Sequence, residues 1–264
     1  MVGSCRARWL LLVPALLLVG AVLIVPSAAG LARSFTAPGD GGQAVFVGSV
    51  NYWRVLADRD ARTSVGNGVE YALISAPLSM IAGLALAIAI HFSPTLRRAI
   101  YPLLIASQAV PIPIIAPLLV LWLGFGIEPK LVVIALVSFF PIVVTTLAGL
   151  AAVDRELIKL MRTFDATRGR TFWHVELPSA LPGVLTGAKI AAAIAVIAAV
   201  FAELSGANAG LGYLYQQSEA QLLMPRAYAT VAILSAFAIA LFALLTLAER
   251  RALPWAHETT GETR

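Results

Sequence analysis

Long apolar stretches separated by short polar ones dominate this sequence. A helix needs roughly 20 residues to cross about 30 Å of hydrocarbon, and six stretches reach that length. Runs such as IAGLALAIAI and AAAIAVIAAV lack the apolar and polar alternation of a transmembrane β-strand. The pattern therefore predicts an all-α, polytopic membrane protein with six transmembrane helices. They cover approximately Trp9–Ala29, Glu70–Ile90, Ile100–Leu123, Leu131–Val153, Leu181–Leu204 and Tyr228–Ala248.

The composition supports a membrane protein. Of the 264 residues, 59% are hydrophobic and only 12% are charged, which is too little polar surface for a soluble domain of this length. The net charge of +5 is spread between the apolar runs, so the lipid bilayer and not nucleic acid is the expected environment. A single cysteine, Cys5, excludes an internal disulfide, and no metal site is predicted.

The first apolar stretch has two possible interpretations. Arg6 and Arg8, the run LLLVPALLLVG and the small residues PSAAGLA also resemble a secretory signal with a cleavage site. The stretch is longer than the roughly 7 to 15 apolar residues of a usual signal, which favours a retained helix. Cleavage of this segment remains an alternative.

Lysine and arginine in the connections predict the orientation, because cytoplasmic loops carry an excess of these residues. With the N-terminus inside, the excess is cytoplasmic, so both termini are predicted in the cytoplasm. The cytoplasmic set is Arg6, Arg8, Arg97, Arg98, Arg155, Lys159, Arg162, Arg168, Arg170, Arg250 and Arg251. The outer set is Arg33, Arg54, Arg59, Arg62, Lys130 and Arg226.

This topology divides the chain into four parts. Residues 1–30 form the N-terminal transmembrane helix, and residues 31–66 form an external amphipathic connection. Residues 67–250 are expected to form a core of five transmembrane helices that contains the inner connection at residues 154–180, and residues 251–264 a cytoplasmic tail. In the external connection, Tyr52, Trp53 and the neighbouring charges suit a helix at the level of the lipid headgroups, which we interpret as a packing and anchoring element.

The inner connection at residues 154–180 is the most informative part of the chain. Leu157, Leu160, Met161 and Phe164 have the i, i+3, i+4, i+7 spacing of one helix face. After a break near residues 165–169, a second short segment is expected to end at Pro178, which lacks a backbone donor. Most links between helices need only about two to eight residues. The extra length favours docking on a soluble partner over a connector that lies on the membrane surface.

The same loop carries a resemblance to a known family. Its spacing from Ala166 through Leu177-Pro178 to Ala180-Leu181-Pro182-Gly183 resembles the cytoplasmic signature of binding-protein-dependent ABC importer permeases. The stretches YWRVLAD, QAVPIPIIAPLLVLWLGFG, GAKIAAAIAVIAAVFAELSGANAGLGYL and LAERRALPW add to the resemblance, which covers about residues 52–255. It is closest to permeases for nitrate, sulfonates, taurine and pyrimidine precursors of thiamine.

The resemblance implies a coupling loop that docks on an ABC ATPase subunit. The implied coupling residues are Leu157, Leu160, Met161, Arg162, Phe164, Asp165, Ala166, Leu177 and Pro178. Two features depart from the family pattern. Its Glu-Ala-Ala positions fall on Lys159, Leu160 and Met161, and Asp165 replaces the glycine between the two short helices. Glycine would provide a turn with positive φ, which Asp adopts less readily.

Candidate pathway residues are polar or helix-breaking positions within the spans. Gln108, Pro111 and Pro113 interrupt the third span, either as pathway lining or as a packing kink. Glu203 either lines the pathway or lies at the outer interface, and Gly210 and Gly212 belong to a gate element or to an ordinary turn.

Three further polar residues lie near the ends of the spans. Lys189 is expected to extend its ammonium toward the headgroups. His91 and His174 are interpreted as interfacial residues rather than ligands.

These features predict the transmembrane permease subunit of an ABC importer. It would work as a dimer, receive a small organic nutrient from an extracytoplasmic solute-binding protein, and need no cofactor of its own because the sequence has no phosphate-binding Gly-rich loop. A pyrimidine precursor of thiamine is the first expectation for the substrate, with sulfonate, taurine or nitrate as alternatives. An intramembrane enzyme lacks a catalytic constellation here, and an ion-coupled secondary carrier is the remaining rival.

Overall fold

The computed structural model describes residues 13, 17–39, 43–207 and 209–255. It divides into two compact units, one formed by Met1–Arg62 and Leu214–Leu234 and the other by Thr63–Tyr213 and Ser235–Arg264. Below they are called the first and second unit. Trp9, where the first predicted span begins, lies outside the described residues, as do Cys5, Arg6 and Arg8.

The described residues contain five helices long and apolar enough to cross a membrane, Leu17–Ser34, Ala61–Phe92, Glu128–Ala151, Arg168–Leu204 and Met224–Ala252. A sixth span is possible if the helix pair Pro94–Ser107 and Ile112–Leu123, bent by 97°, counts as one. The all-α prediction is confirmed, with one small addition in the form of a two-stranded hairpin. The third predicted span is corrected from an interrupted helix to two helices at nearly a right angle.

The first unit begins with a π-helical turn η1 (Gly20–Ile24), which continues into α2 (Val25–Ser34). The antiparallel hairpin of β1 (Thr36–Pro38) and β2 (Ala44–Phe46) follows, with Thr36 opposite Phe46. The side-chain amide of Asn51 donates to the backbone carbonyls of Ser34 and Thr36, at 2.8 and 2.7 Å. Asn51 thereby holds the start of α3 against the end of α2 and the hairpin.

Helix α3 (Val50–Ala57) is the amphipathic helix expected in the external connection. Its Asn51 and Val55 are buried, and Trp53 on the opposite side is 68% exposed. Val55 packs with Ala61, Leu214 and Ala229, so this helix covers the apolar core of the first unit. Anchoring of its exposed face at the membrane interface stays a prediction.

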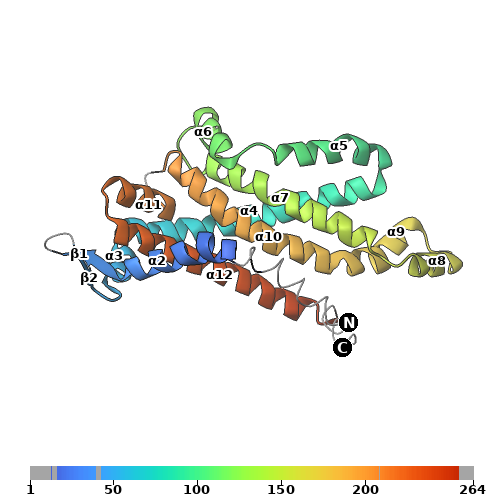
Figure 1. Ribbon diagram of the computed structural model, residues 1–264. Helices are drawn as coiled ribbons and strands as arrows, with labels where there is room; N and C mark the ends of the chain where they lie inside the picture. The colour runs from blue at the N-terminus through green and yellow to red at the C-terminus, as the bar shows by residue number, and fades with distance from the viewer. Residues whose placement is uncertain (1–12, 14–16, 40–42, 208, 256–264) are drawn as a thin grey trace, which may run out of the picture. The chain divides into compact units, whose positions relative to one another are not determined.

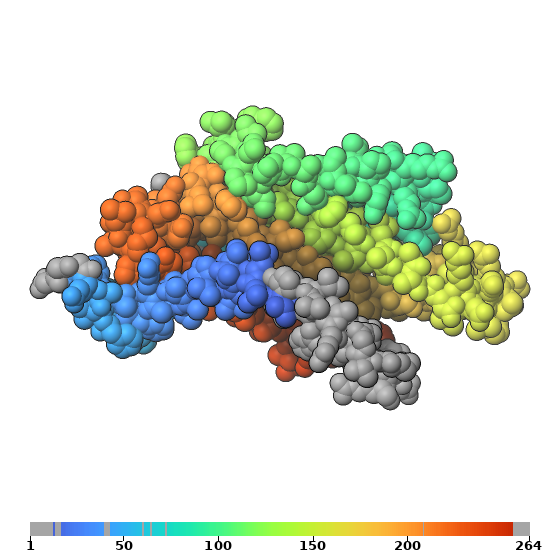
Figure 2. Space-filling model, viewed as in Figure 1, coloured from blue at the N-terminus to red at the C-terminus, as the bar shows by residue number. Residues whose placement is uncertain are grey.

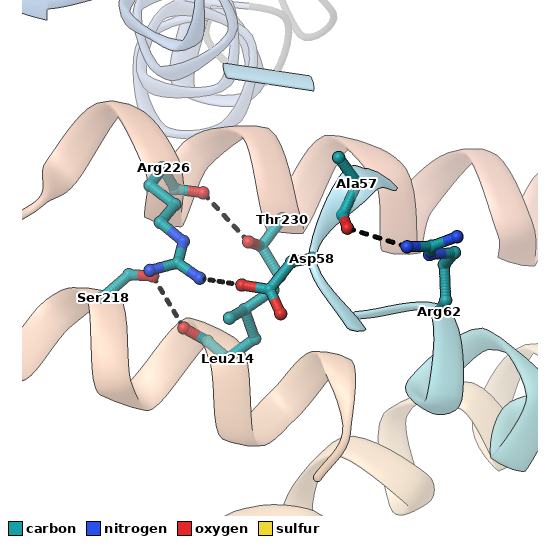
Figure 3. Close-up of polar contacts among 7 residues, drawn as sticks. All are labelled: Ala57, Asp58, Arg62, Leu214, Ser218, Arg226 and Thr230. Atoms are coloured by element: carbon teal, nitrogen blue, oxygen red, sulfur yellow. Dashed lines mark hydrogen bonds and ion pairs between the residues drawn. The ribbon is translucent and has the colours of Figure 1, made fainter. Parts of the chain in front are cut away.

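An ion pair joins two segments of the first unit (Figure 3). The guanidinium of Arg226 donates to the Asp58 carboxylate at 2.5 Å, and both side chains are about one quarter exposed. Asp58 lies directly after α3, and Arg226 lies in the first turn of α12 (Met224–Ala252). Two segments that are 168 positions apart in sequence are thus joined inside one unit.

The second unit is built on two closely packed helices, α7 (Glu128–Ala151) and α10 (Leu177–Leu204). Small residues allow their backbones to approach, as is common between helices in membranes. A β-carbon at Gly183 would lie 2.7 Å from the carbonyl oxygen of Thr145, and one at Gly149 would lie 3.2 Å from the backbone of Ala180. The glycine of the Leu-Pro-Gly element is therefore required by helix packing.

Further helices surround this pair (Figure 1). They are α4 (Arg59–Phe92), α5 (Pro94–Ser107) and α6 (Ile112–Leu123), and the loop elements α8 (Arg155–Thr163), α9 (Arg168–Thr171) and η3 (Phe172–Glu176) lie beyond the ends of α7 and α10. Helix α11 (Leu211–Ala220) follows the turn after α10. Helices α4, α11 and α12 each run from one unit into the other.

Two predicted boundaries are wrong. Helix α4 begins at Arg59 rather than near Glu70, because a helix can continue past the apolar part of its span and hydropathy detects only that part. The second short segment of the inner loop does not end at Pro178, since α9, η3 and α10 form one continuous helix from Arg168 to Leu204. Pro178 lies in the first turn of α10, directly after the π-helical turn, in which the Leu177 N–H bonds to the Phe172 carbonyl.

Candidate functional site

Helix α8 presents an apolar stripe with no cover from the rest of the described chain. None of its residues is buried, and Leu157 and Leu160 are 45% and 51% exposed. Phe164 at its end is 72% exposed. The Asp154 carboxylate accepts from the Glu156 N–H at 2.8 Å and caps the helix start. A capped helix that leaves large apolar side chains in water has the properties of a docking element.

In the turn after α8, Asp165 occupies the position at which the family pattern has a glycine. Asp165 adopts a φ of +51°, the left-handed conformation for which glycine is preferred. The Ala166 N–H bonds to the Met161 carbonyl at 3.1 Å, and the Asp165 N–H bonds to the Arg162 carbonyl at 3.1 Å. These two bonds form a Schellman motif, which ends a helix and satisfies its last carbonyls. Asp165 therefore occupies the same turn conformation that a glycine would provide.

Side chains at the base of the loop connect it to α4. The His91 Nε2 atom lies 2.8 Å from the Glu176 carboxylate, and both side chains are largely buried. Phe172 is buried and packs edge-on against Phe92, and the Arg168 guanidinium lies 4.9 Å from the centre of the Phe92 ring. We call these five residues the loop joint. The interpretation of His91 as an isolated interfacial residue is corrected, because His91 bonds to the loop.

The predicted coupling residues fall into two groups in this arrangement. Leu157, Leu160, Arg162, Phe164 and Asp165 are exposed on α8 and its turn, and Met161 and Ala166 are half-buried beside them. Leu177 and Pro178 instead lie half-buried at the start of α10, next to the loop joint. His174 is exposed, and its ring Nδ1 contacts the Arg170 carbonyl at 2.9 Å. In Figure 2 the loop is the yellow segment that protrudes beyond the neighbouring helices of the second unit.

Three predicted pathway residues come together at the bend between α5 and α6. Gln108, Pro111 and Pro113 line one cavity of about 330 Å³, which also touches Val137 of α7 and Phe201 of α10. The Gln108 side chain is exposed, and its amide donates to the Ser107 hydroxyl at 3.3 Å. We call this the Gln108 cavity. These residues line the cavity, and their contact with a solute stays a prediction.

Glu203 is not part of this cavity. It is only 5% exposed, and its carboxylate accepts from the Gly212 N–H at 2.7 Å. Gly210 has a φ of +150°, and a β-carbon there would overlap the Glu203 carboxylate. Lys130 of α7 is also buried, and its ammonium lies 5.8 Å from the Tyr71 ring centre. The structure thus places Glu203, Gly210 and Gly212 together as the support of the turn between α10 and α11.

The sequence matches the profile of the family described as binding-protein-dependent transport system inner membrane component, over residues 77–254. That match spans more than half of the chain and includes α5 to α10, the loop and the Gln108 cavity. The chain belongs to this family. The resemblance carried by the Leu-Pro and Leu-Pro-Gly elements is thereby confirmed, as is the prediction of a multi-pass inner-membrane permease.

Similar proteins within the family have different substrates in their names. The formylaminopyrimidine transport permease ThiX of Halalkalibacterium halodurans is 40% identical over 182 residues, which are 69% of this chain and 73% of that protein. The riboflavin permease RibX of Chloroflexus aurantiacus is 33% identical over 160 residues, 61% of this chain and 60% of that protein. The taurine permease TauC of Escherichia coli is 30% identical over 177 residues, 67% and 64% respectively.

Solved structures show the same fold. A bacterial ABC transporter for the acidic polysaccharide alginate aligns with a TM-score of 0.71 at 16% identity, covering 93% of this chain and 96% of that chain. The MetNI methionine ABC transporter aligns with a TM-score of 0.63 at 19% identity, covering 78% and 98%. Both are importer permease folds, so the predicted type of architecture is confirmed. At 19% and 16% identity, the likeness shows the fold alone.

One buried ion pair within the family region was missed by sequence reasoning. The Lys189 ammonium donates to the Glu249 carboxylate at 2.6 Å, and these side chains are 18% and 8% exposed. The expectation that Lys189 extends toward the headgroups is therefore wrong, because a partner on α12 satisfies it within the protein. Glu249 lies in the segment LAERRALPW, which contributes to the family resemblance without indicating a partner for this glutamate. A lysine and a glutamate 60 positions apart give no local signal.

Proposed function

We propose that this chain forms the translocation pathway of an ABC importer, as one of two copies in the membrane. A separate ATPase subunit binds and hydrolyses ATP, and an extracytoplasmic binding protein delivers the solute to the outer face. Both termini lie in the cytoplasm in this proposal, which places α8 on the side of the ATPase. The observation that carries the proposal is the capped, exposed apolar stripe of α8, within a chain of the importer permease family.

The loop is arranged to pass on a push from such a partner. It continues by backbone into α10, follows α7 directly, and contacts α4 through the loop joint of His91, Phe92, Arg168, Phe172 and Glu176. Three spans therefore receive the displacement of one docking element. A rigid-body change between inward-open and outward-open arrangements needs a connection of this kind, since packed helices move as units.

A pyrimidine precursor of thiamine is the proposed solute. The support is the 40% identity to a permease named for formylaminopyrimidine, compared with 30% for a permease named for taurine. Taurine, another sulfonate or nitrate is the second candidate. Uptake of labelled hydroxymethylpyrimidine and of labelled taurine, in cells with and without this chain, decides between them. Uptake of taurine alone would overturn the pyrimidine assignment.

Co-purification of the tagged chain with a candidate ABC ATPase subunit tests the coupling role. Replacing Leu160 and Arg162 together by Glu places two negative charges on α8, and we expect the ATPase to be lost while membrane insertion is retained. The matched control changes Arg97 and Arg98 to Glu, which are exposed at the start of α5 on the same proposed side of the membrane. ATPase retention in the α8 variant, or no ATPase bound to the unchanged chain, contradicts the proposal and favours a carrier that acts alone.

A further inference from the structure

A second cavity lies inside the second unit and is separate from the Gln108 cavity. It measures about 360 Å³, within the size range of small-molecule sites, and is a partly open cavity lined by residues of α4, α7, α10 and α12. Its walls are mostly leucine and alanine side chains, and none of the residues that line it carries a charge. The only side-chain polar groups on its walls are the hydroxyls of Ser75, Ser79 and Ser138. We call it the serine cavity.

These hydroxyls differ in how well the protein satisfies them. The Ser75 hydroxyl donates to the Tyr71 carbonyl one turn earlier in α4. The Ser79 side chain is 1% exposed, and its hydroxyl has no hydrogen-bond partner in the described part of the chain. The Ser138 hydroxyl reaches the Ala191 carbonyl only at 3.5 Å, the long limit of a hydrogen bond. The Ser79 hydroxyl, itself buried, therefore has an unused donor and an unused acceptor within the cavity wall.

Pro77, two positions before Ser79, also removes a backbone donor from α4. Pro77 lies inside α4 and has no N–H to donate to the carbonyl of Leu73, and both residues line the cavity. Most buried polar groups in proteins are hydrogen-bonded, because an unsatisfied one costs about 1–3 kcal/mol. An unpaired hydroxyl near a proline, on a wall that is otherwise apolar, has the chemistry of a binding site with a few directional contacts.

We infer that the serine cavity binds the transported solute, and that this solute is a small uncharged heteroaromatic ring. The inference rests on the proposed import function and deepens it. Apolar walls suit the faces of a ring, and hydroxyls pair with ring nitrogens and exocyclic amino or hydroxyl groups. A sulfonate or nitrate would lose its hydration here without gaining a cation, and burial of an unpaired charge is strongly unfavourable. The cavity therefore selects against the anionic candidates.

The cavity is also connected to the coupling loop. Its walls include α7 and α10, the two helices that flank the loop, and α4, which contacts the loop through His91 and Glu176. The fourth wall, α12, is tied to α10 by the Lys189–Glu249 pair. Displacement of the loop by a partner would thus change the relative position of all the walls. A solute held between these helices is held where such a motion can release it.

Binding of radiolabelled hydroxymethylpyrimidine to the full chain in lipid nanodiscs tests this inference. Changing Ser79→Ala removes the unpaired hydroxyl with almost no change in volume, and we expect binding to weaken roughly five- to tenfold. Changing Ala188→Leu fills part of the cavity, and we expect binding to be abolished. The matched control is Thr146→Val, because the Thr146 hydroxyl is equally buried and without a partner but does not line the cavity. It should bind as the unchanged chain does.

Each outcome supports or overturns the inference. Weakening by Ser79→Ala and Ala188→Leu alone, with no competition from ethanesulfonate, supports it. Equal binding by all variants, no binding by the unchanged chain, or equal displacement by ethanesulfonate overturns it. Cellular uptake separates this result from the proposed function. Uptake that needs the chain but is unchanged by Ala188→Leu overturns the cavity and leaves the importer standing, whereas the absence of any chain-dependent uptake overturns the importer.

Discussion

Removing one charge of the Lys189–Glu249 pair should destabilise the protein more than removing both. The two side chains are 18% and 8% exposed and lie between α10 and α12, so a single substitution leaves the other charge largely buried without a partner. Breaking such a pair costs about 3–5 kcal/mol, and replacing both members by uncharged residues is often close to neutral. For each single substitution we take a loss of about 3 kcal/mol in the free energy of unfolding. This is the lower end of the range, because the Lys189 side chain is still 18% exposed.

The expected shift is large enough to measure. For chains of about this length, 1 kcal/mol corresponds to roughly 2–4 °C in the midpoint of thermal unfolding, so Lys189→Met or Glu249→Gln should each lower it by roughly 6–12 °C. The double variant should recover most of this loss. The assay is the amount of monodisperse protein remaining on size-exclusion chromatography after heating in detergent. Lys159→Met, an exposed lysine on α8, is the control and should change the midpoint by little.

Two results would refute the reasoning. If the single variants melt with the unchanged chain, the pair contributes nothing to holding α12 on α10. If the double variant loses the sum of the two single losses, the side chains act independently, since a direct interaction appears as a departure from additivity.

Three further predictions follow from individual backbone and side-chain environments. Asp165→Gly should stabilise the turn after α8 by about 1 kcal/mol, because φ is +51°, and slower hydrogen exchange in α8 would show it; faster exchange would contradict the assignment of the turn. Gly210→Ala should destabilise the turn after α10, because the added carbon overlaps the Glu203 carboxylate, and an unchanged unfolding midpoint would contradict this. Burial, and secondarily Glu219, raises the pKa of the Tyr215 phenol, so the contribution of this tyrosine to stability should be present below about pH 10 and be lost as the pH rises further. Ultraviolet titration against Tyr215→Phe checks it, and ionisation at the pKa of free tyrosine would count against it.

The helical class and the approximate positions of the long spans could be predicted, because apolar length is a local property of the sequence. Six spans were expected, and the described residues contain five, or six if the bent pair α5 and α6 counts as one. The first helix of the loop could also be predicted, since the spacing of Leu157, Leu160 and Phe164 defines one face of α8 without reference to any other segment. Their exposure in the structure agrees with that pattern. The bend of 97° between α5 and α6 could be predicted only in part. The prolines near Gln108 indicate a break, but the angle depends on packing that the local sequence does not encode.

The contacts between distant segments could not be predicted from one sequence. Glu176 pairs with His91 across 85 positions, and Asp58 pairs with Arg226 across 168. A charge near a span end has the same local appearance whether it reaches the headgroups or a partner on another helix. The sequence around Lys189 favours an ammonium that extends toward the headgroups, because nothing within that segment indicates Glu249, which is 60 positions away. Pairing is decided by which helices become neighbours, and that is a property of the whole fold.

The distinction between satisfied and unsatisfied polar groups then separates structural residues from candidate solute contacts. Lys189 and Glu203 are the most conspicuous charges near the spans, yet each is bonded within the protein, to Glu249 and to the Gly212 backbone. A solute that replaced those bonds would have to compensate for their loss. Within the residues that the structure describes, Ser79 has no such bond to lose, so a hydrogen bond to a solute there is a net gain. The uncharged hydroxyl is therefore a stronger candidate for solute contact than either charge, and this favours a neutral solute.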